Sequence, residues 1–352
     1  APGDVWPVRL PDGRYAIPPS SLQGMVRSIL TVAAFGRLGG RVEDRRFAVR
    51  DLTGESNTAE LLYKGRLSTG SGTKAAPFEM RAKPAWLVRR DGRIEIIKCL
   101  AARIRIVDLF QYGPVDLAET LSGATDAGQR LQEIQKEFPD LAVDIQLESL
   151  KSHIHSGGKY IRYERCSLGG PTNGTIVATG KPTAGVNAAR RKKREFVFHT
   201  PDRASAPSHP GEEVPADVWR DFKEIHDPPK GSGRKINPNW DYWKKDFETG
   251  KPVPVFYLEE GGRITAMGTA FMFKAAMPLS THDLLKNSSE EHFSKAPDLP
   301  TLIFGAAEGE TDAEGLKRRA SFGFGMTAAN PQLGTKRVAL SSPKPAFYPN
   351  YV

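Results

Sequence analysis

AWLVRRDGRIEIIKC, residues 85–99, contains two short runs of β-branched and aromatic residues on either side of Asp91-Gly92. An Asp-Gly dipeptide accepts the positive φ angles of a type I′ turn, which joins two antiparallel strands. The stretch VPVFYLEEGGRITAMGTAFMF, residues 253–273, repeats this arrangement around Gly261-Gly262. The sequence therefore predicts two antiparallel hairpins far apart along the chain.

Helical periodicity occurs at 22–33, 125–138 and 215–225, where apolar residues recur every three or four positions. In the last segment Pro215 suits a first helical turn, and one face carries Val218, Trp219, Phe222 and Ile225. Helices that alternate with antiparallel hairpins predict an α+β fold.

Three segments rich in Gly, Pro and Ser, at 68–77, 201–217 and 226–239, are expected to be disordered or extended. The chain has 352 residues, enough for one large or two ordinary domains. We expect a single domain, 1–352, with an insertion or a protruding element within 115–250.

Basic residues exceed acidic ones, with 50 Lys and Arg against 41 Asp and Glu, which favours a polyanionic partner. The densest basic run precedes an apolar segment typical of a strand, and consists of Arg190, Arg191, Lys192, Lys193 and Arg194. This run is interpreted either as a phosphate-binding element or as a solvated loop.

The number of cysteines and the hydropathy of the chain bear on disulfide bonds and on membrane insertion. Cys99 and Cys166 are too few for a disulfide framework, and we expect both to be buried as small apolar groups. No run of about 18 apolar residues suggests a membrane span, so we expect no membrane partner and a cytoplasmic location.

IPPSSLQGMVRSIL, residues 17–30, has the features of a helix start. Ser20 is the expected N-cap, and Gln23 would complete a capping box. Gly24 costs about 1 kcal/mol relative to alanine inside a helix, so we expect a close approach there. The expected apolar stripe consists of Leu22, Met25, Val26, Ile29 and Ala33.

The same segment offers a phosphate site. Free N–H groups of a helix start, together with Ser20, Ser21 and Arg27, can hold a phosphate. In the alternative interpretation the serines only cap the helix, Gly24 packs against a strand and Arg27 pairs with an acid.

IPPSSLQGMVRSI resembles the IPGSSLRGMLR signature of the CRISPR-associated RAMP superfamily, with Pro19 replacing the usual glycine and Gln23 the usual basic residue. Further blocks follow in family order and resemble one branch, found in type III-like effector complexes and in related fused effectors. These blocks are AWLVRRDGRIEI, PVFYLEEGGRI, MFKAAMPLSTHDLL, TLIFGAAEGE with RRASFGFG, and LSSPKPAFYPNYV.

The resemblance implies a modified ferredoxin-like, RRM-related RAMP fold with an antiparallel sheet, helices and long loop insertions. It implies a backbone subunit that polymerises along a CRISPR guide RNA and presents the guide for pairing with target RNA in an antiviral ribonucleoprotein. The implied partners are guide RNA, target RNA, copies of the chain itself, other effector subunits and a separate nuclease. Guide binding would need no cofactor.

Family members bind the guide with the signature helix and with a Gly-rich loop near the C-terminus. By position, the resemblance assigns RNA binding to Ser20, Ser21, Gly24, Arg27, Lys317, Arg318, Arg319 and Gly323. A β-hairpin thumb is implied around 174–196, which contains the basic run. Four alternating aromatic residues are expected to lie in the core rather than on RNA, namely Phe196, Phe198, Phe322 and Phe324.

Cleavage of target RNA remains an alternative. Many family members carry a cutting aspartate before the signature helix, where this chain has only Asp4 and Asp12. Asp44 and Asp51 follow the helix and could coordinate Mg²⁺, although Asp–Arg pairs that hold a loop are the favoured explanation for both. The chain is therefore expected to be a scaffold; the alternatives are a magnesium-dependent endoribonuclease and a general RNA-binding protein.

Overall fold

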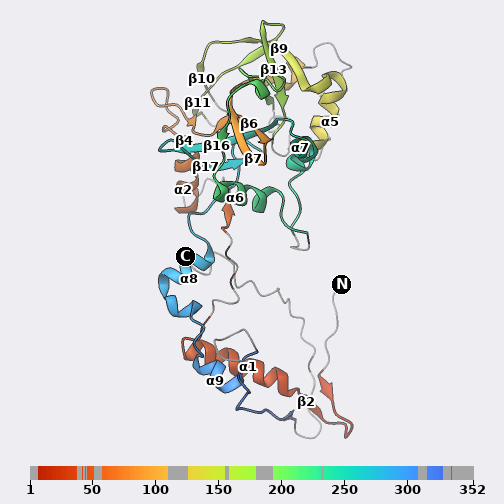
Figure 1. Cartoon of the computed structure of the whole chain (residues 1–352), viewed down its shortest axis with the longest axis vertical. Helices are drawn as coiled ribbons and strands as arrows, with labels where there is room; N and C mark the ends of the chain where they lie inside the picture. Colours follow the sequence, from red (N-terminus) through yellow and green to blue (C-terminus); the bar gives the residue numbers. More distant parts are fainter. Residues whose placement is uncertain are drawn as a thin grey trace. The chain divides into compact units, whose positions relative to one another are not determined.

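The computed structural model describes residues 7–37, 42, 44, 46–50, 58–109, 126–154, 158–179, 193–230, 234–307, 315–327 and 334. Contacts between residues divide the chain into two compact units (Figure 1). Unit 1 comprises Ala1–Phe47 and Met277–Val352, and unit 2 comprises Ala48–Ala276. The segment 115–250, in which an insertion was expected, belongs to unit 2.

The first sheet of unit 2 has five strands in the order β15-β7-β6-β16-β17. The strands are β15 (Glu212–Glu213), β7 (Arg93–Lys98), β6 (Lys83–Arg90), β16 (Val253–Glu260) and β17 (Arg263–Gly268). Positive φ angles occur at both residues of each connecting turn, 47° and 80° at Asp91-Gly92 and 59° and 76° at Gly261-Gly262. Both predicted hairpins are therefore confirmed.

The second sheet of unit 2 also has five strands, in the order β12-β9-β13-β14-β8. The strands are β12 (Cys166–Leu168), β9 (Ala142–Leu147), β13 (Thr172–Val177), β14 (Arg194–His199) and β8 (Leu100–Arg105). Every neighbouring pair in both sheets is antiparallel.

Helices and short strands complete unit 2. The helices are α2 (Thr58–Leu67), α3 (Ile106–Leu109), α5 (Ala127–Glu137), α6 (Ala216–His226) and α7 (Pro238–Glu248), with 3₁₀ turns at Pro139–Leu141 and Ala206–Ser208. The helices predicted at 125–138 and 215–225 are confirmed. Pro215 lies one position before the first turn, as the N-cap residue of α6. Three further strand pairs are β3 (Ala48–Val49) with β18 (Ala275–Ala276), β4 (Ser68–Thr69) with β5 (Glu79–Met80), and β10 (Lys151–Ile154) with β11 (Tyr160–Tyr163).

Two apolar cores hold unit 2 together. One core joins both sheets to α5, α6 and α7, with Leu131, Phe222 and Trp243 among its members. The other contains Trp86 and Phe198, whose rings meet edge to face at 5.4 Å. Alternate residues of one strand enter different cores because successive side chains point to opposite faces.

The burial of several residues had been predicted. Phe196 and Phe198 lie in the second core, as expected, and Cys99 and Cys166 are buried. Burial raises the pKa of both thiols, that of Cys166 to about 12. Both cysteines are therefore unreactive apolar groups.

The segment 201–217 is ordered, contrary to expectation. Its carbonyl groups accept hydrogen bonds from side chains of β6: Trp86 Nε1 donates to the oxygen of Pro201, and Arg90 donates to those of Pro207 and His209. Ala206 is fully buried. Hydrogen bonds from β6 thus order a segment whose Gly, Pro and Ser content would not order it alone.

Unit 1 has a small sheet of order β1-β2-β19, formed by β1 (Val8–Arg9), β2 (Tyr15–Ile17) and β19 (Gly325–Met326). Its helices are α1 (Pro19–Ala33), α8 (Thr281–Ser288) and α9 (Leu299–Phe304), with a 3₁₀ turn at Glu290–Phe293. Helix α1 contacts α9, and Asp298, which caps α9, also accepts a hydrogen bond from the backbone N–H of Arg37.

Helices combined with antiparallel strand pairs make this an α+β protein. Among the described residues, no helix combines the length and the hydropathy that a bilayer crossing requires.

Candidate nucleic-acid interface

Helix α1 begins earlier than the sequence predicts. The N-cap residue is Pro18, no side chain caps the helix, and Pro19 occupies its first turn. Proline suits this position because its fixed φ matches the helix. It lacks an N–H group, but an N–H group at this first position has no acceptor within the helix in any case. The predicted N-cap role of Ser20 and its capping box with Gln23 are therefore wrong, and Ser20 and Ser21 lie exposed in the first turn.

Gly24 is exposed, and a Cβ atom built on it would meet no atom of the described residues within 4 Å. The alternative that Gly24 packs against a strand is therefore not met among the described residues, and the close approach of another molecule stays a prediction. The glycine leaves an open strip on the first turns of α1, which contain no acidic residue.

The predicted apolar stripe of α1 is largely exposed. Met25 is 55% and Ile29 63% exposed, and Val32 on the same side of the helix is 79% exposed. The side of α1 that packs within unit 1 carries residues such as Leu22 and Leu30, which are half-buried. Apolar periodicity identified the helix correctly, but it did not identify the face that packs.

Residues 315–327 lie beside the start of α1, although almost 300 positions separate the two segments. Strand β19 pairs with β2, with Gly325 opposite Ile17. Arg318 Nη1 donates to Gln23 Oε1 at 3.5 Å. A Cβ on Gly325 would approach Leu22 to 3.2 Å, so the glycine allows this close packing. The structure thus brings together the two segments that contain most of the predicted RNA-binding residues.

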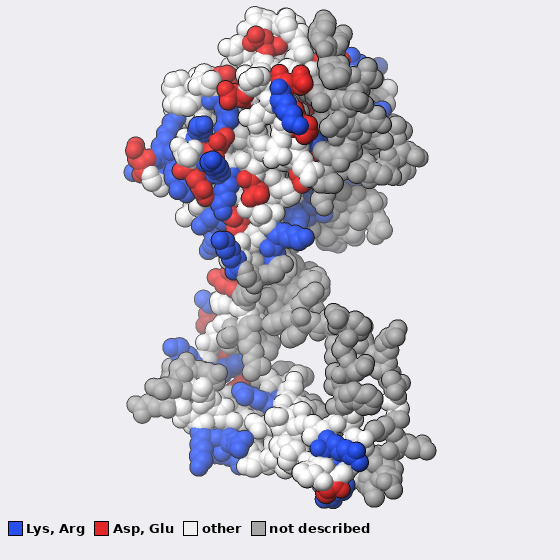
Figure 2. Space-filling model, turned by 90° about the vertical axis from the view of Figure 1, so that its right-hand side faces the viewer, with Lys and Arg blue, Asp and Glu red and all other residues white. Residues whose placement is uncertain are grey.

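Basic side chains at this junction are available to a ligand. Lys317, Arg318 and Arg319 are exposed, and Arg27 is half-buried. None of these four residues forms an ion pair with a carboxylate in the part of the chain that the structure describes. Figure 2 shows basic side chains on the visible face of unit 1, in the lower part of the view, with few acidic ones. We refer to α1 residues 20–27 and segment 317–323 as the α1 junction.

The aromatic residues of the second segment differ in burial. Phe322 is half-buried and stacks on Phe304, with ring centroids 6.2 Å apart. Phe324 is 49% exposed, so its predicted place in the core is wrong. Gly323, between them, is exposed. The segment pairs with β2 through only two residues, which leaves most of its side chains at the surface.

The predicted basic run is not part of the α1 junction. Arg194 is the first residue of β14 in unit 2 and is half-buried, and Lys193, which precedes the strand, is exposed. Arg190, Arg191 and Lys192 lie outside the described residues, as does Asp51 and as do residues 180–192 of the expected thumb.

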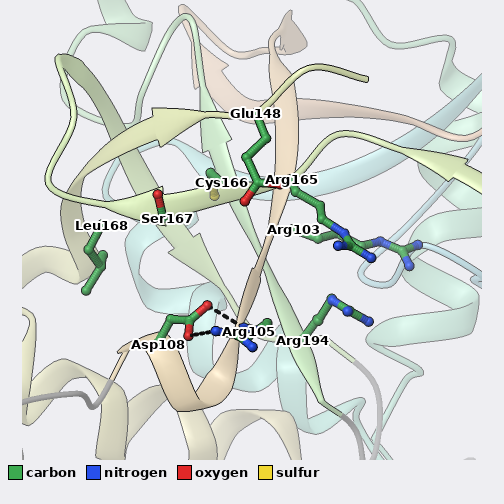
Figure 3. A pocket seen from close by; sticks show the side chains of 9 residues that line it. All are labelled: Arg103, Arg105, Asp108, Glu148, Arg165, Cys166, Ser167, Leu168 and Arg194. Carbon is green, nitrogen blue, oxygen red and sulfur yellow. Dashed lines mark hydrogen bonds and ion pairs between the residues drawn. The ribbon is translucent and has the colours of Figure 1, made fainter. Parts of the chain in front are cut away.

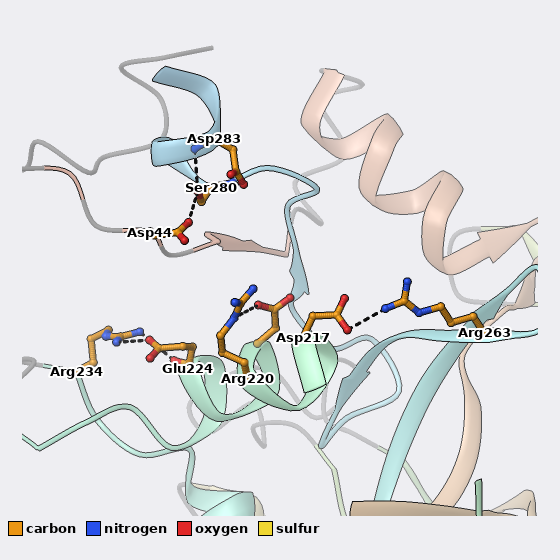
Figure 4. Close-up of polar contacts among 9 residues, drawn as sticks. Asp44, Asp217, Arg220, Glu224, Arg234, Arg263, Ser280 and Asp283 are labelled. Carbon is orange, nitrogen blue, oxygen red and sulfur yellow. Dashed lines mark hydrogen bonds and ion pairs between the residues drawn. The ribbon is translucent and has the colours of Figure 1, made fainter. Parts of the chain in front are cut away.

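Asp44 belongs to a group of three potential metal ligands in unit 1. Its carboxylate, the imidazole of His282 and the carboxylate of Asp283 each offer one donor atom, and these atoms lie within 4.8 Å of one another. Ser280 Oγ donates to Asp44 Oδ1 at 2.7 Å and accepts from the backbone N–H of Asp283 (Figure 4). Ser280 therefore connects Asp44 to the first turn of α8.

Local contacts fix the positions of Asp283 and His282. Ser280 and Asp283 form a capping box at the start of α8, and the backbone N–H of Ser280 holds the pKa of Asp283 below its ordinary value. The ring of His282 packs against Phe293 at 4.0 Å between centroids. Two carboxylates and one imidazole suit Mn²⁺ or Zn²⁺ as well as Mg²⁺.

Sequence reasoning identified Asp44 but missed its neighbours. His282 and Asp283 stand more than 230 positions away, in STHDLL. The S-x-x-D pattern in this motif indicates a helix start, but nothing local indicates that Asp44 contacts it. Asp44 accepts a hydrogen bond from Ser280, and its Asp–Arg pairing stays a prediction because Arg41 and Arg45 lie outside the described residues.

No protein-family model matches this chain, and no curated protein matches its sequence.

Proposed function

We propose that the protein is a CRISPR guide-RNA-binding backbone subunit of the RAMP superfamily, with the modified ferredoxin-like fold of that superfamily. In this role it polymerises along the guide RNA and presents the guide to target RNA. Its partners are copies of itself, other subunits of a type III-like or fused effector, and a separate nuclease.

The observation that carries this proposal is the α1 junction. The resemblance assigns guide binding to two segments at opposite ends of the chain. Strand pairing between β19 and β2 and the hydrogen bond from Arg318 to Gln23 bring these two segments onto one surface. Segments with unrelated roles would not need to meet, so their proximity supports a shared ligand.

The chemistry of the α1 junction suits recognition of an RNA backbone. A subunit that accepts any guide sequence contacts phosphates and sugars rather than base edges. In the first turn of α1 the N–H groups of Ser21 and Leu22 already donate to the Pro18 carbonyl. The turn therefore offers the positive end of the helix dipole, and the exposed Ser20 and Ser21 add hydroxyl groups. Gly24 lets a strand of RNA approach the helix closely, and exposed Lys317 and Arg318 supply charge.

The direct test is to express the chain with a CRISPR array and its neighbouring genes, purify it and sequence the RNA that copurifies. We expect short RNAs that share one repeat-derived tag. Random RNA would replace the proposal with general RNA binding, and absence of RNA would remove both.

A pair of matched variants links the RNA to the α1 junction. Arg318→Glu should reduce the copurified RNA, because it reverses a charge that has no acidic partner among the described residues. Lys295→Glu makes the same charge change at another exposed site of unit 1 and should leave the RNA unchanged. An equal loss in both variants would mean that only overall charge matters.

A second candidate function is cleavage of the target RNA by the chain itself. The group formed by Asp44, His282 and Asp283 favours it, because these residues could hold a divalent cation next to bound RNA. A bound Mg²⁺ or Mn²⁺ would supply charge stabilisation at the scissile phosphate. Guide binding alone requires no cofactor.

A further inference from the structure

Unit 2 contains an arginine-rich pocket of about 400 Å³ at one end of the second sheet (Figure 3). Four arginines and two carboxylates are among its lining residues: Arg103, Arg105, Arg165, Arg194, Asp108 and Glu148. All of its lining residues belong to unit 2, whereas the residues of the α1 junction belong to unit 1.

Strand pairing forces like charges together in this pocket. Arg105 of β8 stands directly opposite Arg194 of β14, and Arg103 forms a backbone bridge with Arg165. Like charges on opposing strand positions destabilise a sheet. Because Arg103 and Arg105 are two apart on β8, their side chains share one face of the sheet.

Only one of the four arginines is neutralised. Arg105 forms two hydrogen bonds with Asp108, at 2.7 and 2.5 Å. The other three, Arg103, Arg165 and Arg194, form no ion pair with any carboxylate in the described ranges. The Nε atom of each of these three is buried and has no hydrogen-bond partner among the described residues. A buried donor without a hydrogen bond lowers the stability of the fold. A ligand oxygen that accepts from these Nε atoms would remove this cost.

The aromatic ring of Tyr163 orients the three unpaired guanidinium groups. They lie 4.4 Å (Arg103), 5.5 Å (Arg165) and 5.8 Å (Arg194) from its centroid. Arg165 also donates to the hydroxyl of Tyr163 at 3.3 Å. Burial and the nearby charge of Arg194 lower the pKa of Arg103 to about 10, which still leaves it protonated at neutral pH. The side chains are thus held in place before any ligand binds.

We propose that this pocket binds a phosphate group. Planar guanidinium forks match phosphate oxygens, and three of them without carboxylate partners supply the charge that a phosphate needs. The volume admits one phosphate and part of its carrier. The carrier is the terminal phosphomonoester of a nucleotide or RNA end, or an internal phosphodiester of an RNA strand. The site does not depend on guide binding at the α1 junction.

Titration of the full-length protein with inorganic phosphate, followed by calorimetry, tests the site itself. We expect saturable binding that weakens about tenfold in Arg165→Gln and in Arg194→Gln, since each variant loses a charge-assisted hydrogen bond. Arg263→Gln is the matched control, because Arg263 is an exposed arginine of unit 2 outside the pocket. Arg165→Lys keeps the positive charge but lacks the planar guanidinium group. Its affinity for phosphate should lie between those of the wild type and Arg165→Gln.

The result that overturns the proposal is binding that does not saturate, or equal affinity in the pocket variants and in Arg263→Gln. Thermal unfolding of each variant separates loss of the site from loss of the fold; if either glutamine variant unfolds, Arg165→Lys decides. Single-stranded RNA with a 5′-phosphate or a 5′-hydroxyl then identifies the carrier. Preference for the phosphorylated end indicates a terminal phosphate, whereas equal binding of both, weakened by Arg165→Gln, indicates an internal one.

Discussion

Asp44 is the residue on which the choice between scaffold and nuclease depends. For a scaffold, we expect Asp44→Asn to leave cleavage of target RNA by the assembled complex unchanged. Asparagine keeps the acceptor for Ser280 Oγ, so the start of α8 should be preserved. The measurement is the rate of target cleavage at saturating Mg²⁺, together with the amount of bound guide.

Loss of cutting with intact guide binding would instead assign the chemistry to this chain. In that case His282→Gln should produce the same loss, because its imidazole is part of the same group of ligands. Asp12→Asn is a matched control, since Asp12 is an exposed acid of unit 1 that pairs with Arg14.

His226 makes the stability of the protein depend on pH. It is 4% exposed, and neither ring nitrogen has a hydrogen-bond partner among the described residues. Burial, assisted by the charge of Lys274, lowers its pKa from 6.5 to about 3. As the pH falls below 6.5, the imidazole is protonated in the unfolded chain but stays neutral in the folded chain. The free energy of unfolding present above pH 6.5 therefore decreases as the pH falls toward 3.

Urea unfolding at pH 7 and pH 5 measures this effect. Between these pH values His226→Leu should lose about 2 kcal/mol less of its free energy of unfolding than the wild type. His209→Leu alters an exposed histidine and should behave as the wild type does. An identical pH response in all three proteins would show that His226 does not titrate in this way.

Single residues were predicted well where local chemistry decides their role. Cys99 and Phe198 were expected in the core because small sulfur and aromatic groups on strands are usually buried. Ser20 was predicted to be the N-cap residue of α1, but the helix begins earlier, with Pro18 as N-cap and Pro19 in its first turn. The contact of Asp44 with Ser280 and the position of Arg194 beside the Tyr163 ring could not be predicted, since each joins segments distant in sequence.

At the scale of the element, Gly24 of α1 offers a test that separates stability from binding. Gly24→Ala should raise the free energy of unfolding by about 1 kcal/mol, because the new methyl group meets open space and alanine favours the helix. The same methyl group stands where RNA is proposed to approach, so guide binding should weaken. Chemical denaturation and retention of copurified RNA measure the two effects.

Gly65 of α2 provides the matched control. It is also exposed within a helix, and a Cβ there would meet no described atom within 4 Å. Gly65→Ala should therefore give a similar stabilisation with no change in bound RNA. Loss of RNA in both variants, or in neither, would argue against a special role for Gly24.

Elements whose signals are local were predicted, and those that depend on distant partners were not. The residues of the Asp91-Gly92 and Gly261-Gly262 turns favour the positive φ angles that a tight hairpin needs, and both hairpins are present. The order of the strands within each sheet has no such signal. Segment 201–217 was expected to be disordered or extended because of its Gly, Pro and Ser content, and its composition does not reveal that side chains of β6 donate hydrogen bonds to it.

At the scale of the whole molecule, unit 2 is a continuous segment with two apolar cores and both five-stranded sheets. We expect residues 48–276 expressed alone to unfold in one cooperative thermal transition, because these cores draw their buried residues from within the unit. The measurement is calorimetry of the fragment. Gradual loss of structure, with binding of a hydrophobic dye before heating, would contradict the prediction.

The division into two units could not be derived from composition. Two domains joined by a linker were possible from the sequence, but its long middle part was interpreted as an insertion into one fold. Both boundaries lie at short strands, β3 and β18, that have no turn or linker signal of their own. Only pairing between residues more than 220 positions apart reveals where unit 2 begins and ends.

That pairing has a genetic consequence. Ala48 stands opposite Ala276, and the backbone N–H of Met277 donates to the oxygen of Phe47 at 2.7 Å. The chain thus enters and leaves unit 2 through neighbouring positions, about 5 Å apart in an antiparallel pair. One insertion or deletion event in the coding sequence therefore suffices to gain or lose the entire unit, and the flanking exits of unit 1 can be rejoined by a short turn.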